Sequence, residues 1–368
     1  MNLFPEQQLA VDQILLWSKS LPQSLEFKLG GYAGTGKTTV IKWIIEALKN
    51  DSACVGLAAF TGKAVSVLRK KGCSDAQTLH SMLYHVEQRG KAVYYHLRES
   101  LPFDYIIVDE ASMISKELYS DLMSFEIPVL WVGDPGQLEP VGDDINLMQQ
   151  PDFVLKTIHR QGEGSEILRF AEQLRNKKEP KAFISDGHTE IEVRPKFQLG
   201  SINCDQFICG FNKTRLSINF KARLQLGHSG EVLLPDERIC ILRNSRNHGV
   251  FNGMLLTTTK VTRKNDQVLL VDAKDEINQV FRDLPLFVPQ FNKQSTLDAY
   301  EHKQASKRHN SDLILADYGY CLTGHKSQGS EWDTVCVIEE IWHEKWEASR
   351  WRYTTATRAA KKLFYFYS

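Results

Sequence analysis

The sequence has no long hydrophobic run and no excess of either charge. No apolar stretch approaches the roughly 18 residues that a membrane span needs, and the first residues do not form a signal-peptide pattern. Lysine plus arginine equals aspartate plus glutamate, at 45 each. This balance excludes the broadly basic composition of a histone-like protein, so a nucleic-acid partner must bind in a local groove that contains few cations. We expect no membrane partner.

The cysteines are scattered, and the sequence contains no internal repeat or low-complexity tract. No two cysteines form a C-x-x-C pair, and their number is odd: Cys54, Cys73, Cys204, Cys209, Cys240, Cys321 and Cys336. This distribution is typical of reduced thiols in the cytosol, rather than of a disulfide framework or a zinc site. We therefore predict a cytoplasmic protein.

Short β-rich runs alternate with helical patterns along the chain. A continuous apolar run such as Tyr105–Val108 is typical of a parallel strand that is buried on both faces. The other predicted strands are Phe27–Leu29, Val55–Phe60, Val129–Val132, Gln206–Cys209, Thr334–Ile338 and Leu363–Tyr367. Helical patterns lie between many of them, for example at Thr38–Leu48 and Ser165–Leu174. The alternation predicts an α/β fold with parallel sheets.

The 368 residues suffice for two or three compact domains. A linker pattern at Gln149–Asp152 predicts a first lobe over residues 1–150 and a second lobe over 151–368. Within the first lobe, residues 84–101 predict an inserted β-hairpin, because strand-like flanks surround a Gln-Arg-Gly turn. Within the second lobe, residues 246–311 predict an inserted β-rich subdomain whose fold the sequence does not determine.

The most informative motif is Gly31-Tyr-Ala-Gly-Thr-Gly36-Lys37-Thr38, which follows a predicted strand and opens a predicted helix. Its glycines let backbone N–H groups curl around phosphate, where the helix N-terminus adds partial positive charge. Lys37 can reach the β and γ phosphates, and the Thr38 hydroxyl can ligate Mg²⁺. The motif predicts an ATP site that uses Mg²⁺. The predicted nucleotide-binding residues are Gly34, Thr35, Gly36, Lys37, Thr38 and Thr39.

Two acidic residues follow the strand Tyr105–Val108, where a P-loop enzyme requires them. Asp109 can hold Mg²⁺ through water, and Glu110 can orient and deprotonate the attacking water. Without the P-loop, two solvated acids at a strand end would be the simpler interpretation. A third strand is followed by Gly-Asp-Pro-Gly-Gln, in which Gln137 could touch the γ phosphate or could be the surface residue of a turn.

These motifs, together with several others, resemble the superfamily-one DNA helicases and, within them, the RecD/Dda branch. The motifs follow the order of that family over nearly the whole chain. The further matching segments are Gln7–Ala10, Ala59–Ala64, Thr78–His80, Leu155–Gln161, Phe211–Arg215, Tyr320–Gly329 and Tyr353–Ala359. The resemblance implies two RecA-like lobes with one ATP site, which agrees with the single P-loop and the two groups of predicted strands.

The resemblance also implies roles for individual residues. Gln7 would read adenine, and Arg160 and Arg358 would compensate charge at the γ phosphate, with surface ion pairs as the alternative for both arginines. The implied DNA contacts are Thr61, Lys63, Thr78, His80, Thr323 and His325. The alternative for the hydroxyls is helix capping or strand filling, and for the histidines a hydrogen-bonded structural role.

Together these inferences predict an ATP-dependent DNA helicase that acts as a monomer on single-stranded DNA and on junctions between single and double strands. The resemblance, rather than any residue, implies 5′-to-3′ movement. In the predicted hairpin, Tyr94 and Tyr95 could separate strands or could only pack the hairpin onto its neighbour. The alternative function is an accessory protein of replication or recombination that uses ATP as a conformational switch. Glu110 disfavours it, because a switch does not need fast hydrolysis.

Overall fold

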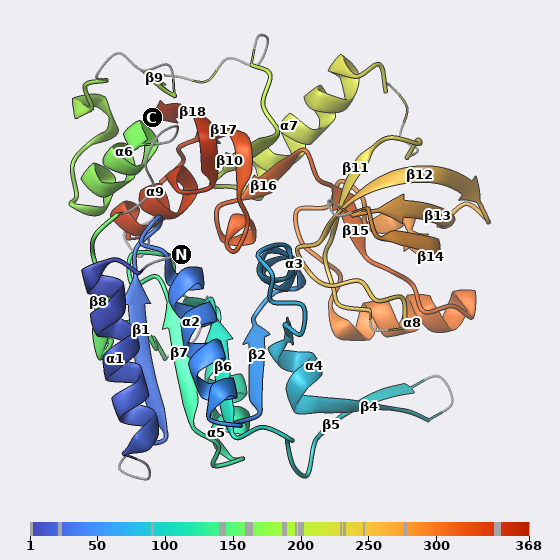
Figure 1. The fold of residues 1–368 in the computed structure, drawn as a ribbon. Helices are drawn as coiled ribbons and strands as arrows, with labels where there is room; N and C mark the ends of the chain where they lie inside the picture. Colours follow the sequence, from blue (N-terminus) through green and yellow to red (C-terminus); the bar gives the residue numbers. More distant parts are fainter. Residues whose placement is uncertain are drawn as a thin grey trace. The chain divides into compact units, whose positions relative to one another are not determined.

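A computed structural model gives the fold of most of the chain (Figure 1). The described residues are 3–20, 24–89, 92–139, 145–158, 165–185, 190–195, 197, 202–228, 230, 233–245, 247–275, 278–341 and 347–367; of residues 63, 86–89, 92–95 and 165 only the backbone is described. The chain divides into two compact units, Met1–Leu168 and Arg169–Ser368. In the described part, no helix has both the length and the apolar character needed to cross a membrane.

The first unit is built on a six-stranded sheet in which every neighbouring pair is parallel, in the order β3-β2-β6-β7-β1-β8. In chain order its strands are β1 Glu26–Gly31, β2 Val55–Ala59, β3 Gln77–Thr78, β6 Tyr105–Asp109, β7 Val129–Gly133 and β8 Phe153–Leu155. β8 lies beyond the expected linker at Gln149–Asp152 yet pairs with β1, so the first unit extends past residue 150.

Helices cover both faces of this sheet, which explains why its strands are continuously apolar. Within β6, Ile107 belongs to the core that includes residues of α1, α2 and α3, whereas Ile106 and Val108 belong to a second core with residues of α4 and α5. α1 and α2 lie side by side (Figure 1). The helices are α1 Pro5–Lys19, α2 Lys37–Asn50, α3 Gly62–Lys70, α4 Leu79–Leu83 and α5 Lys116–Met123, with a 3-10 turn, η1, at Ala111–Met113.

A two-stranded antiparallel ribbon follows α4 and corresponds to the predicted hairpin insertion. Its strands, β4 Tyr84–Arg89 and β5 Ala92–Leu97, are paired along their whole length, from Tyr84 opposite Leu97 to Arg89 opposite Ala92. The rings of His85 and His96 stack across the two strands, with centroids 5.4 Å apart.

The second unit contains a parallel sheet in the order β16-β10-β17-β18-β9. In chain order its strands are β9 Ile191–Pro195, β10 Gln206–Cys209, β16 Cys321–Thr323, β17 Trp332–Ile338 and β18 Ala359–Tyr367. Its helices and 3-10 turns are α6 Ser165–Arg175, which begins in the first unit, η2 Pro180–Ala182, α7 Asn212–Gln225, η4 His325–Ser327 and α9 Ala348–Ala356. Two parallel α/β sheets in one chain confirm the predicted fold class.

The β-rich insertion is an antiparallel five-stranded sheet in the order β14-β13-β12-β11-β15. The elements are β11 Arg238–Ile241, β12 Leu255–Arg263, β13 Val268–Lys274, β14 Val280–Phe287, η3 Val288–Gln290, α8 Ala299–His309 and β15 Ala316–Tyr318. The sheet is wider than the expected insertion of residues 246–311, because β11 and β15 flank that segment and pair with each other. The insertion also contains a helix, α8, which was not predicted from the sequence.

Helix α7 links the parallel sheet to the β-rich sheet through two buried ion pairs. Arg215 contacts Asp317 of β15 at 2.6 Å, and Arg223 contacts Glu237 beside β11 at 2.5 Å. The Glu237 carboxylate also accepts the amide of Leu234, so its charge is well compensated. All four charged side chains are at least nine-tenths buried. Such pairs fix geometry strongly, because neither partner can be removed without leaving an uncompensated charge inside the protein.

We predict that Glu237→Ala lowers the free energy of unfolding by about 3–5 kcal/mol, because Arg223 would stay buried without its partner. The measurement is urea denaturation of the full chain. Asp266→Ala is the matched control, because its pair with Arg263 is exposed and should contribute less than about 1 kcal/mol. Equal effects of the two substitutions would show that the buried pair does not hold α7 to the β-rich sheet.

Candidate nucleotide and nucleic-acid sites

The P-loop joins β1 to α2 at the C-terminal edge of the first sheet. Gly34 and Gly36 have φ angles of +79° and +82°, a region that favours glycine. Gly36 also lies against the side-chain nitrogen of Gln7, where a Cβ would overlap. Thr35 is fully buried, and its hydroxyl donates to the carbonyl of Tyr32 at 2.8 Å. These contacts give the loop a defined curl that opens into the first turn of α2.

The ammonium of Lys37 lies folded back on the loop. Its Nζ donates to the carbonyls of Gly31 at 2.7 Å and Tyr32 at 3.3 Å. The next two residues, Thr38 and Thr39, are half-buried in the first turn of α2. Lysine, hydroxyls and helix amides therefore converge at one point, which is the donor set that a polyphosphate requires.

Gln7 contacts the P-loop itself. Its Nε2 donates to the carbonyl of Thr35 at 3.0 Å, its Oε1 accepts the amide of Phe4 at 3.2 Å, and its side chain is buried. In this position Gln7 braces the loop, and its expected role in reading adenine stays a prediction. The neighbouring Glu6, which sequence reasoning missed, accepts the amides of Lys156 and Thr157 beyond β8. No local pattern marks a glutamate for that role.

The two predicted acids stand at the end of β6. Glu110 has a φ of +56°, an unusual backbone conformation for a side chain that is not glycine, and its amide donates to Oδ1 of Asp109 at 2.9 Å. Burial raises the pKa of the Asp109 carboxyl above its ordinary value, while the Lys37 ammonium and the Glu110 amide act in the opposite direction.

Strand order brings these groups together. β7 lies between β1 and β6, with Gly133 opposite Gly30 and Trp131 opposite Val108. Neighbouring strands are about 4.8 Å apart, so the P-loop strand and the acid strand are separated by roughly 10 Å. Gln137 follows β7, so it lies in a turn that starts between the P-loop strand and the acid strand. It is buried in a turn closed by its amide, which donates to the carbonyl of Asp134.

Thr38 and Asp109 are the residues that would hold Mg²⁺. A hydroxyl and a carboxylate fit a cation that prefers oxygen ligands and keeps several waters. Over the described ranges, no cluster of three or more His, Cys, Asp or Glu side chains could hold a metal ion.

Three of the expected DNA contacts in the first unit have structural partners. The hydroxyl of Thr61 caps α3 by accepting the amide of Ala64, and the hydroxyl of Thr78 caps α4 by accepting the amide of Ser81. His80 packs between the rings of Phe60 and Tyr84, with centroids 6.2 and 6.1 Å away. Their DNA contacts stay predictions, as does that of Lys63, whose side chain lies outside the described part.

In the second unit, Thr323 ends β16 and His325 begins η4. Gly324 between them packs so closely on the indole of Trp351 that a Cβ there would overlap. Burial lowers the pKa of the His325 imidazole below its ordinary value. The ring is therefore neutral near pH 7 and can offer a phosphate a hydrogen bond but no charge.

Arg358 is buried after α9 and is held within its own unit. Its Nε donates to the carbonyl of Thr354 at 2.8 Å, its Nη1 to the carbonyl of Ser330 at 3.0 Å, and its Nη2 to the hydroxyl of Thr357 at 2.9 Å. Three of its five N–H groups are thus engaged, and two are left for a further acceptor. Arg160 and the side chains of Tyr94 and Tyr95 lie outside the described part.

The second parallel sheet has a junction that corresponds to the P-loop, and it is filled by the protein. β10 leads through Gly210 and Phe211 into α7, and both amides donate to the carboxylate of Glu340, at 3.1 and 3.0 Å. The Thr214 hydroxyl donates to the same carboxylate. A Cβ on Gly210 would overlap the backbone of Glu340. A carboxylate of the protein itself therefore occupies the N-terminus of α7 at this junction.

Two family models match this chain, one toward each end. The model of the AAA domain family matches residues 2–192, and that of the UvrD-like helicase C-terminal domain matches residues 318–365. The ATP-dependent RecD2 DNA helicase of Deinococcus radiodurans is 26% identical over 363 residues, which cover 91% of this chain and 46% of that protein. The ATP-dependent DNA helicase dda of Enterobacteria phage T4 is 31% identical over 175 residues, 44% of this chain and 40% of that protein. The chain thus spans less than half the length of either relative.

Solved structures share the fold at low sequence identity. A structure of Pif1 helicases at forked double-stranded DNA superposes with a TM-score of 0.61 at 18% identity, over 99% of this chain and 92% of that chain. Bacteroides Pif1 helicase in complex with ADP-AlF3 and single-stranded DNA gives 0.59 at 17% identity, with the same coverage. More than half of the chain matches the AAA domain model. The chain belongs to the AAA domain family, and its similarity to RecD2 and dda is consistent with the expected resemblance to the RecD/Dda branch.

Proposed function

We propose that the protein is an ATP-dependent DNA helicase, which couples ATP hydrolysis to movement along single-stranded DNA and to separation of a duplex. The observation that carries this proposal is the C-terminal edge of the first sheet. There the P-loop, Gln137 and the Asp109–Glu110 pair follow three adjacent strands, β1, β7 and β6. The relatives named above, RecD2 and dda, are ATP-dependent DNA helicases.

Hydrolysis would use residues of this edge in distinct roles. The Lys37 ammonium would exchange its contacts with the carbonyls of Gly31 and Tyr32 for phosphate oxygens. Thr38 and Asp109 would hold Mg²⁺, which supplies charge neutralisation at the phosphates when bound. The Glu110 carboxylate would orient the attacking water and accept its proton. Gln137, next to both strands, would respond to the presence of the γ phosphate.

The second unit would contribute Arg358. Its two remaining N–H groups can donate to a phosphate oxygen without breaking the bonds that hold its guanidinium to Thr354, Ser330 and Thr357. A charge-assisted contact of this kind would be made with ATP and lost after hydrolysis, which would drive alternating closure and opening. The resemblance extends the same role to Arg160.

The DNA contacts would involve few charges. Thr61, Thr78 and Thr323 offer hydroxyls, and the neutral ring of His325 offers a hydrogen bond, so recognition would be directed at the backbone and would ignore sequence. We propose that the protein acts as a monomer on single strands and at junctions, and moves 5′ to 3′ as its family resemblance implies.

The direct test is ATPase activity with and without single-stranded DNA, together with strand displacement on 5′-tailed and 3′-tailed duplexes. We expect DNA to stimulate hydrolysis and the 5′-tailed duplex alone to be unwound. Unwinding of the 3′-tailed duplex would reverse the direction. Nucleotide-dependent DNA binding with no unwinding of either duplex would favour the ATP-switched accessory protein instead.

Substitutions of Lys37 and Glu110 should affect ATP binding and ATP hydrolysis differently. We predict that Lys37→Ala lowers both ATP affinity and turnover, because a phosphate contact is lost. Glu110→Gln should bind ATP normally while turnover falls by about 10²-fold or more, because the base is lost and the shape is kept. Fluorescent-nucleotide binding and steady-state ATPase assays measure the two effects. Glu117→Gln, on the exposed side of α5, is the matched control. Turnover in Glu110→Gln equal to that of the control would remove Glu110 from catalysis.

The β4–β5 ribbon should matter for unwinding rather than for hydrolysis. We predict that replacing residues 87–94 with a short Gly-Ser turn abolishes duplex separation and leaves DNA-stimulated ATPase largely intact, because a stiff paired ribbon is needed to keep the second strand out. The same replacement at residues 264–267, between β12 and β13, is the control. Strand displacement at the parent rate after the 87–94 replacement would show that the ribbon is not the wedge.

A further inference from the structure

The helix that leads to Arg358 has no single buried face. α9 spans Ala348–Ala356 and packs on β18 (Figure 1). Successive side chains of a helix are about 100° apart, so the buried residues of α9 lie on all sides of its axis. They are Ser349, Trp351, Tyr353, Thr354, Thr355 and Ala356. Because burial on every side favours no particular rotation of the helix about its axis, directional contacts are needed to set that rotation.

Arg352 provides such contacts in the middle of α9. Its Nε and Nη2 donate to Oε1 of Glu339, at 3.1 and 2.8 Å. Its Nη1 and Nη2 also donate to the two carboxylate oxygens of Glu179, at 3.3 and 3.1 Å. Glu339 directly follows β17, and its amide donates to the carbonyl of Phe366 in β18. The guanidinium of Arg352 therefore fixes α9 to the edge of the sheet at which β17 and β18 end.

The Glu339 carboxylate is enclosed by its partners. Its side chain is 3% exposed, whereas that of Glu179 is 56% exposed. Its second oxygen accepts the hydroxyl of Tyr365 at 2.9 Å. Burial and the charge of Glu339 raise the pKa of that phenol well above its ordinary value, so the hydroxyl stays a donor. Water screens an exposed pair, but a buried and hydrogen-bonded pair holds its geometry. Glu339 is therefore the partner that holds Arg352 in place.

The segment that Arg352 fixes also holds Arg358. Nε of Arg358 donates to the carbonyl of Thr354, which lies two residues beyond Arg352 in α9. Nη2 of Arg358 donates to the Thr357 hydroxyl, which itself donates to the same carbonyl. The carbonyl of Ser330, which accepts Nη1, lies outside the helix. The direction of the Arg358 guanidinium therefore depends on the rotation of α9.

We propose that Glu339 is a positioning residue for ATP hydrolysis, which acts through Arg352 and α9 to aim the guanidinium of Arg358 at the γ phosphate. This inference rests on the proposed function, because it requires Arg358 to contact ATP. Glu339 itself does not touch the nucleotide, since its carboxylate is enclosed within the second unit. Neither Glu339 nor Arg352 belongs to the nearby segments that match the helicase family, Tyr320–Gly329 and Tyr353–Ala359, so the resemblance does not imply this role.

The alternative is that the network of Glu339 and Arg352 only stabilises the fold, and the two roles predict different kinetics. A positioning role changes turnover, because a displacement of about 1 Å at a catalytic group can lower a rate by up to about 10²-fold. A purely structural role changes the free energy of unfolding and leaves the turnover of folded molecules unchanged.

The first test compares the ATPase kinetics of variants of the full chain at saturating oligothymidylate, at a temperature at which circular dichroism shows each variant to be folded. Glu339→Ala should lower kcat by about 10-fold to 10²-fold and leave KM for ATP nearly unchanged. Glu339→Gln should recover most of kcat, because its amide oxygen can still accept from Arg352. Glu237→Ala is the matched control, because it also removes a buried carboxylate from an arginine of the second unit, but one that belongs to α7. A loss of kcat in Glu339→Ala no greater than in this control would overturn the proposal.

A double-mutant cycle tests whether Glu339 acts through Arg358. Once Arg358 is replaced by alanine, no guanidinium is left to aim, so Glu339→Ala/Arg358→Ala should have the same kcat as Arg358→Ala in a phosphate-release assay. Arg352→Gln should follow the pattern of Glu339→Ala, because it lacks the fork that joins the two carboxylates. A further loss in the double variant, by the factor measured for Glu339→Ala alone, would show that Glu339 acts through another group, and the proposal would be wrong.

The proposed function and the role of Glu339 can fail separately. If Arg358→Ala slows hydrolysis strongly while Glu339→Ala has the kcat of the parent, only the role of Glu339 fails. If Arg358→Ala hydrolyses ATP at the parent rate, the contribution proposed for Arg358 fails, and the role of Glu339 fails with it.

Discussion

Parallel strand pairing in the first sheet is the constraint on which the nucleotide site depends. Because β1, β6 and β7 run in the same direction, the loops that follow them emerge from one edge. Strand β7 then sets the separation between the P-loop and the acids to two strand spacings, roughly 10 Å. A phosphate chain with its magnesium ion and a water molecule fits that interval, whereas groups on opposite edges could not act on one substrate. The continuous burial of these strands on both faces keeps the edge rigid.

The two parallel sheets handle the same structural position differently. In the first unit the turn after β1 is curled by glycines with positive φ, braced by Gln7, and left with donors for phosphate. In the second unit the turn after β10 is occupied by the carboxylate of Glu340, which satisfies the amides of Gly210 and Phe211. The turn of the first sheet can therefore accept a phosphate of a ligand, whereas the turn of the second sheet already binds the carboxylate of Glu340. This difference is a physical reason to expect the nucleotide at the first sheet rather than at the second.

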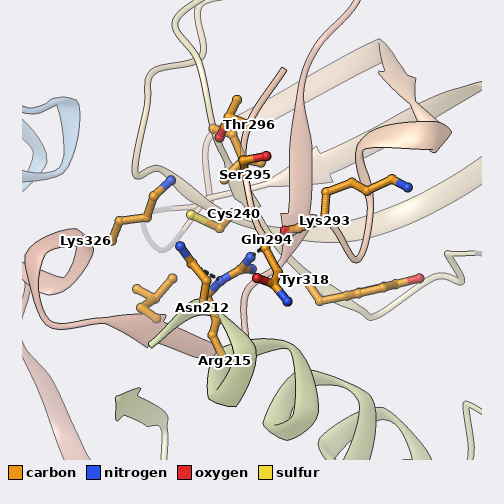
Figure 2. Close-up of a pocket in the computed structure, with 11 residues that line it drawn as sticks. Asn212, Arg215, Cys240, Lys293, Gln294, Ser295, Thr296, Tyr318 and Lys326 are labelled. Atoms are coloured by element: carbon orange, nitrogen blue, oxygen red, sulfur yellow. Dashed lines mark hydrogen bonds between the residues drawn. The ribbon is translucent and has the colours of Figure 1, made fainter. Parts of the chain in front are cut away.

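The buried ion pairs of the second unit connect α7 to the β-rich sheet. The pairs Arg215–Asp317 and Arg223–Glu237 tie α7 to the β-rich sheet from both ends of the helix. Burial of ions is costly unless each is matched, so the pairs define one relative position of the two sheets. A pocket of about 220 Å³ lies beside Arg215, between the start of α7 and the loop that precedes α8 (Figure 2).

The sequence by itself determined whatever depends on local pattern. Apolar runs such as Tyr105–Val108 specified buried parallel strands, and the spacing from Gly31 to Thr38 specified a phosphate-binding turn, because both follow from steric and solvation rules that act over a few residues. The sequence also predicted that Asp109 and Glu110 end a strand. It did not show that Gln7 would contact Thr35, or that the hydroxyls of Thr61 and Thr78 would cap helices.

Only the tertiary structure decided what depends on residues distant in the chain. The β-rich sheet closes through pairing of β11 with β15, elements that are separated by the whole insertion, so no local pattern within residues 246–311 could reveal its extent. The cavity joins Asn212, Ser295 and Lys326, and an isolated lysine or serine has no signature that distinguishes a ligand contact from ordinary solvation. Charge compensation is set by distances in space, and those distances exist only after the chain has folded.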